Sequence, residues 1–89
     1  MAQDRLSDDR PTTVDTGFRD IPAQGRHLLA VAPGIESTIA RREAADLEDA
    51  VRRLLGGAIE SGADGSTAYL CEFALEVARA LRDASDAIP

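Results

Sequence analysis

The chain contains one long stretch whose apolar residues recur with the period of an α-helix. Between Ile35 and Ile59 no proline interrupts the run, and alanine, the best helix former, is frequent. Apolar side chains return at steps of three or four residues, at Ala40, Ala44, Leu47, Val51, Leu54 and Ala58, with Leu55 and Ile59 widening the stripe. Such spacing places them on one face of a helix. The stretch therefore predicts an amphipathic helix over about residues 35–60.

Gly56 and Gly57 leave two interpretations of where this helix ends. Glycine readily adopts the left-handed conformation that terminates helices, so the pair could form a cap. Alternatively the helix tolerates both glycines, at a cost of about 1 kcal/mol each relative to alanine. Because Ala58 and Ile59 keep the apolar period beyond the glycines, the pattern favours a continuous helix.

A second helix is predicted over about residues 67–84. Its apolar stripe consists of Leu70, Phe73, Ala74, Val77, Leu81 and Ala84. Ser66 or Thr67 would cap its N-terminus, and the glycine-containing segment 61–65 predicts a turn. A connection this short makes two helices antiparallel neighbours. The expected fold is thus mostly α, an antiparallel helical hairpin whose open apolar flank a second copy could close as a four-helix bundle.

The N-terminal third is harder to interpret. Residues 1–16 are charged and polar, which predicts a disordered acidic tail before a single small helical domain over 17–89. The apolar run 27–32 fits either a short helix or irregular arm, which we slightly favour, or a strand. The apolar residues of this region are expected to cover the apolar face of the two helices: Phe18, Ile21, Leu28, Leu29 and Val31.

Size and charge limit the functions worth considering. A chain of 89 residues forms a small core, which favours a homo-oligomer or a complex with a partner. The net charge of −6 argues against direct binding to nucleic acid or to an anionic membrane surface, and suits a partner with a basic surface. Cys71 is the single cysteine, and no apolar run is long enough to span a membrane, so a cytoplasmic protein is expected.

No motif indicates catalysis, a cofactor or a metal. His27 is the single histidine, and the sequence places no partner beside it. Glu72 and Glu76 are four residues apart but have no third ligand in helical register. The segment from Asp64 to Ser66 superficially resembles the attachment site of carrier proteins, although a glycine stands inside the expected Asp-Ser-Leu pattern. We therefore expect a protein that is not an enzyme.

By elimination, the expected function is recognition. The leading hypothesis is a small acidic protein that binds and modulates a larger protein, as antitoxins and phage-carried inhibitors do. Its candidate contact residues are Asp46, Glu48 and Asp49 on the polar side of the first helix. One alternative is a homo-oligomeric assembly subunit. The other is a DNA-binding regulator of the ribbon-helix-helix type, whose single strand would come from residues 27–32.

Overall fold

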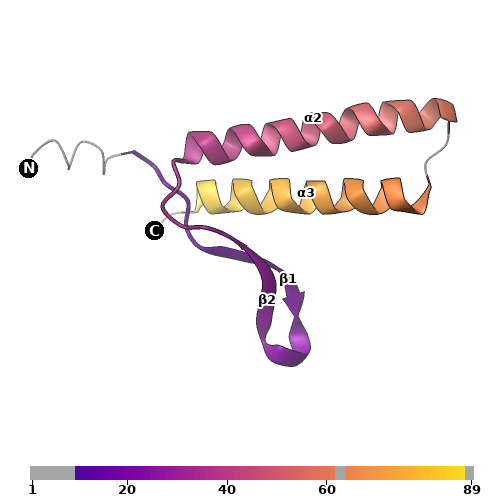
Figure 1. Ribbon diagram of the computed structural model, residues 1–89. Helices are drawn as coiled ribbons and strands as arrows, with labels where there is room; N and C mark the ends of the chain where they lie inside the picture. Colours follow the sequence, from indigo (N-terminus) through magenta and orange to yellow (C-terminus); the bar gives the residue numbers. More distant parts are fainter. Residues whose placement is uncertain (1–9, 62–63, 88–89) are drawn as a thin grey trace, which may run out of the picture.

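The structure is a computed structural model that describes residues 10–61 and 64–87, without the side chains of 58–61. Two strands precede two long helices in the order β1 (Thr16–Ile21), β2 (Arg26–Val31), α2 (Ser37–Ser61) and α3 (Gly65–Asp86) (Figure 1). The fold is mainly helical, as the apolar periodicity predicts. It also contains a two-stranded antiparallel sheet, which the sequence analysis does not predict as such.

Both helices begin and end within two residues of their predicted bounds. Helix α2 continues through Gly56 and Gly57, which confirms the interpretation that we favour. Helix α3 begins earlier than predicted because its N-cap is Asp64, whose Oδ1 accepts a hydrogen bond from Thr67 N at 2.8 Å. Neither Ser66 nor Thr67 is the cap, and residues 62–63 of the predicted turn lie outside the described part of the chain.

Helices α2 and α3 lie side by side and run in opposite directions (Figure 1). The most buried residues of α2 are small or of moderate size, namely Ala40, Ala44 and Val51, each at most 3% exposed. On α3, Cys71 and Ala78 are buried to a similar degree. Small side chains let the two helices approach closely, but they bury little apolar area per turn. The contact between the helices is therefore narrow.

The segment before α2 is a β-hairpin. Strands β1 and β2 pair with Phe18 opposite Leu29 and Asp20 opposite His27, and a short 3-10 turn from Pro22 to Gln24 connects them. Gly25 closes the turn with a positive φ of 62°, which glycine adopts without strain. Residues 26–31 are thus a strand, and our slight preference for a helix or irregular arm over 27–32 is wrong.

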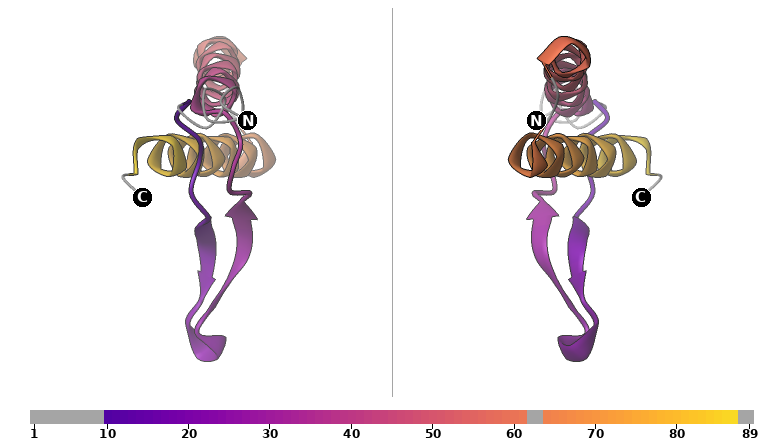
Figure 2. Two further views of the ribbon diagram at one scale, coloured as in Figure 1. Left: turned by 90° about the vertical axis from the view of Figure 1, so that its left-hand side faces the viewer. Right: turned by 90° about the vertical axis from the view of Figure 1, so that its right-hand side faces the viewer.

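The hairpin contacts α3 at its base and through Arg19 of β1, and its outer part projects away from the helices (Figures 1 and 2). At the base, Val31 is buried with Ala80 and Ala84, and Phe18 and Leu81 pack against this cluster. Farther along β2, Leu28 is 65% exposed and Leu29 is 37% exposed. The expectation that all of these apolar residues cover both helices is therefore wrong for the outer part of the hairpin.

A short segment at the N-terminal end ties the hairpin to the helices. Thr13 is 3% exposed; its hydroxyl donates to Ala32 O at 2.7 Å and accepts from Ile35 N at 3.0 Å. Val14 N donates to Ala84 O near the end of α3. The last part of the segment predicted as a disordered tail, from about residue 11 onward, thus makes hydrogen bonds to the rest of the chain. Residues 1–9 lie outside the described part.

All of these elements lie in one layer. Helix α2, helix α3 and the hairpin follow one another across the molecule, and none covers the broad faces of the helix pair (Figures 1 and 2). The thinnest extent between Cα atoms is 15 Å. Domains are normally built from at least two packed layers around a core. The broad faces of the helix pair are therefore the places to look for a functional surface.

Candidate functional site

One broad face of the helix pair carries ion pairs that bridge α2 and α3. Arg82 donates two hydrogen bonds to the Glu48 carboxylate, at 2.9 and 2.7 Å, in the parallel fork arrangement that suits arginine and carboxylate. Arg41 donates to Asp86 at 2.6 Å and to Ser85 O at 3.3 Å. These contacts set how far the helices are shifted along each other. We refer to this side as the ion-paired face.

The Glu48–Arg82 pair also shifts the titration of both groups. The hydrogen bonds from Arg82 lower the pKa of Glu48 below its ordinary value, and the carboxylate raises the pKa of Arg82. Both side chains are partly exposed, at 28% and 41%, so solvent weakens the attraction between them. The pair holds the two helices in register and remains ionised at neutral pH.

The three acidic residues that we expected to contact a partner do not form one cluster. Successive residues of a helix are about 100° apart, so Asp46, Glu48 and Asp49 point in different directions. Glu48 turns toward α3 and pairs with Arg82. Asp49 pairs with Arg53 along α2 at 2.8 Å, and Asp46 is exposed. The sequence shows only that acidic residues lie on the polar side of this helix. It does not show which arginines pair with them.

The opposite broad face of the helix pair is apolar. Helical phase places six residues there, which we call the apolar face: Ile39, Leu47 and Leu54 of α2, and Leu70, Val77 and Leu81 of α3. Ile39 is 55% exposed, Leu54 51% and Leu70 58%. The other three are half-buried. Most of these residues belong to the stripes recognised in the sequence. Leu81 packs against the base of the hairpin, and no described element of the chain covers the other five.

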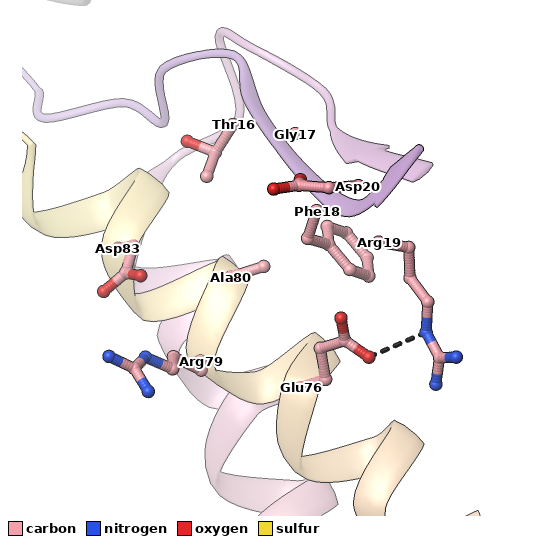
Figure 3. Close-up of a pocket in the computed structure, with 9 residues that line it drawn as sticks. All are labelled: Thr16, Gly17, Phe18, Arg19, Asp20, Glu76, Arg79, Ala80 and Asp83. Atoms are coloured by element: carbon pink, nitrogen blue, oxygen red, sulfur yellow. Dashed lines mark ion pairs between the residues drawn. The ribbon is translucent and has the colours of Figure 1, made fainter. Parts of the chain in front are cut away.

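A groove of about 440 Å³ separates β1 from α3, and Figure 3 shows the residues that line it. At one end Arg19 Nε lies 2.7 Å from Glu76 Oε1, without the alignment of a hydrogen bond. The Arg19 guanidinium also lies over the rings of Phe73 and Tyr69, at 4.9 and 5.6 Å from their centroids. These contacts dock the hairpin on α3, and nothing in the sequence pattern indicated them.

His27 has a carboxylate partner that sequence reasoning could not place. The hairpin register brings Asp20 opposite His27, and Asp20 Oδ1 lies 2.6 Å from His27 Nδ1. Both side chains are more than half exposed. The small pocket beside them contains no serine, cysteine or threonine among its lining residues, so the geometry assembles no nucleophile there.

The described residues hold no arrangement suited to a metal. Within 10–61 and 64–87, no three His, Cys, Asp or Glu side chains are grouped as ligands. Of the glutamates four apart on α3, Glu76 pairs with Arg19 and Glu72 is exposed. Cys71 is 5% exposed. Neither described helix is both long enough and apolar enough to cross a membrane.

Comparison of the chain with protein-family models, with curated proteins and with solved structures finds no match. The candidate site therefore has to be chosen on the geometry and chemistry of the chain itself. On those grounds the apolar face is the strongest candidate among the described surfaces, because large apolar side chains gather there without a cover.

Proposed function

We propose that this chain is a protein-interaction module that binds another folded chain through its apolar face. The observation that carries the proposal is the contrast between the two broad faces of the helix pair. One face carries ion pairs between the helices, and the leucines on that side, Leu55 and Leu75, are less exposed, at 45% and 44%. The other leaves Ile39, Leu54 and Leu70 about half exposed. A face of this kind marks a contact with another protein more often than an accidental surface.

The energetics favour covering this face. Burying a leucine or isoleucine side chain completely contributes about 1.5–3 kcal/mol relative to leaving it exposed. Ile39, Leu54 and Leu70 are each about half exposed. Burying the exposed half of each side chain beneath a partner would therefore contribute roughly 1 kcal/mol per residue to stability. For a chain of 89 residues with a narrow contact between its helices, that gain is a large part of the total stability.

This proposal keeps the recognition role and moves the contact away from the acidic residues. Glu48 and Asp49 already have arginine partners within the chain, so a basic partner surface would have to compete with Arg82 and Arg53. A modulator of a larger protein and an assembly subunit would both use the apolar face. The ribbon-helix-helix alternative gains no support, because β2 pairs with β1 of its own chain and carries the exposed Leu28.

The test is a photo-reactive amino acid placed at position 54 or, as a matched control, at position 75. Leu54 and Leu75 are both helical leucines of similar exposure, at 51% and 44%, but Leu75 lies on the ion-paired side. Irradiation in the native cell should give covalent adducts from position 54 and few from position 75. Equal adducts from both positions, or none from position 54, would overturn the proposal.

A further inference from the structure

We infer that the chain covering the apolar face is a second copy of this protein, packed face to face so that the two helix pairs form a four-helix bundle. The inference rests on the function proposed above and names the occupant of the same surface. Three observations favour a copy over an unrelated partner: the size of the face, its low charge and the way its residues are layered.

The size of the face suits a stable dimer. Helix α3 has 22 residues and α2 has 25, so the pair is roughly 33–37 Å long at 1.5 Å per residue. Two helices packed 8–10 Å apart present a strip about 20 Å wide. The apolar face spans about 29 Å of this length, from Ile39 to the level of Leu70, so its footprint is roughly 500–600 Å² per chain, near the ~600 Å² that each partner contributes at the lower end of standard interfaces.

The charge distribution suits a surface like itself. Between Ile39 and Leu54, helical phase places Glu43 on the apolar side of α2, with Asp46 at its edge beside Ile39. Among the described residues, the ion pairs between α2 and α3 lie on the opposite face. A strongly charged partner would find almost no complementary charge here. A second apolar face meets this one with Glu43 as the main charge near the contact, and leaves both ion-paired faces outward.

The apolar residues are also layered as a bundle core requires. The contacts of Arg82 with Glu48 and of Arg41 with Asp86 set Leu47 about level with Leu81. By the same shift, Leu54 lies about level with Ala74. Each chain therefore presents half of these two core layers, and a copy related by a two-fold axis supplies the other half. Antiparallel helix pairs joined by short turns form four-helix bundles in this way.

Light scattering coupled to size-exclusion chromatography tests the inference on the full chain. The wild-type protein should have twice the chain mass of 9.4 kDa. Leu54→Asp should weaken dimerisation by at least about 100-fold, because it buries two unpaired carboxylates in the interface. Leu75→Asp makes the same chemical change on the ion-paired side and should leave the dimer intact. A wild-type monomer, or a Leu54→Asp dimer of unchanged affinity, would overturn the inference.

Circular dichroism shows whether Leu54→Asp retains its helices, and Leu54→Ala provides a milder variant if it does not. Leu54→Ala should weaken the dimer about tenfold or more relative to Leu75→Ala, and equal affinities would count against the inference. The photo-crosslinking result separates the two proposals. Adducts at position 54 with a chain of different mass, together with a monomeric wild type, would refute the second copy and leave the proposed function standing. No adduct at position 54 would refute both.

Discussion

Thr13 joins three parts of the chain that are distant in sequence. Its hydroxyl contacts Ala32 O and Ile35 N, its backbone N donates to Ile35 O, and its carbonyl accepts from Gly34 N. Through these bonds it holds the N-terminal segment, the end of the hairpin and the start of α2 together. Removing one partner of such a buried hydrogen bond destabilises the protein by more than the bond contributes. The reason is that the other partner stays buried, without the bond and without water to replace it.

We expect Thr13→Val to lower the free energy of unfolding by about 1–3 kcal/mol. Valine keeps the shape of threonine, but it leaves Ile35 N without its hydroxyl acceptor and Ala32 O without its hydroxyl donor. Thr13→Ser retains the hydroxyl and should cost clearly less. Urea denaturation of the three proteins measures the difference. Equal losses for valine and serine would show that the hydroxyl contributes little.

At this scale the sequence reveals short-range partners better than long-range ones. The start of α3 was predicted within two residues, because the end of the apolar period and a nearby cap are local signals, although the cap is Asp64 and neither Ser66 nor Thr67. The partner of Thr13 lies 22 residues away at Ile35, and the partner of Glu48 lies 34 residues away at Arg82. Contacts at such distances depend on how the elements pack, which no local pattern records.

The helices and the hairpin differ in how strongly the sequence specifies them. Both helices repeat their apolar stripe over four turns or more, so their existence and approximate bounds follow from periodicity. Each strand has six residues, and β1 contains Gly17 and a positive φ at Arg19. Such a strand shows no clear alternation of apolar and polar residues. It forms because its partner strand and α3 lie beside it. For this reason no strand was predicted over residues 16–21.

At the level of helix α2, we expect Gly56→Ala to stabilise the protein by about 0.5–1 kcal/mol. Gly56 lies inside the helix, and a Cβ atom built there meets nothing within 4 Å. Alanine therefore gains helix propensity without a clash. Thermal unfolding followed at 222 nm gives the shift relative to wild type. A destabilised Gly56→Ala would mean that the helix does not continue through this position in solution.

The pairing of α2 with α3 should depend on pH through Glu48. Its pKa is lower in the folded protein than in the unfolded chain, so its contribution is complete above the unfolded value of about 4.3 and is lost as pH falls through the lower, folded value. We expect Glu48→Gln to lose stability relative to wild type at pH 7 and to show less further loss at low pH. Urea unfolding at both pH values measures this; an identical pH dependence in both proteins would contradict it.

For the whole molecule, the single layer of elements is the feature with the greatest consequences. The apolar stripes predict that two helices leave an apolar flank open. They do not show that the hairpin projects away from most of this flank, because the hairpin is not evident in the sequence pattern. Of the three acidic residues predicted to contact a partner, Glu48 and Asp49 form ion pairs within the chain.

A dimer whose folding and association are coupled should become more heat-stable at higher concentration. Each tenfold rise in concentration adds about 1.4 kcal/mol to the stability of a two-chain unit, which corresponds to roughly 3–5 °C in Tm for two chains of this length. Differential scanning calorimetry over a hundredfold concentration range measures the trend. A Tm that stays constant over that range is the outcome expected of a monomer.

The central claim, that a second copy covers the apolar face, is tested most directly by an isotope-filtered NMR experiment on a one-to-one mixture of labelled and unlabelled chains. We expect intermolecular contacts from the methyl groups of Ile39, Leu54 and Leu70, and none from Leu75. The absence of any intermolecular contact, or contacts confined to Leu75 on the ion-paired side, would contradict the account.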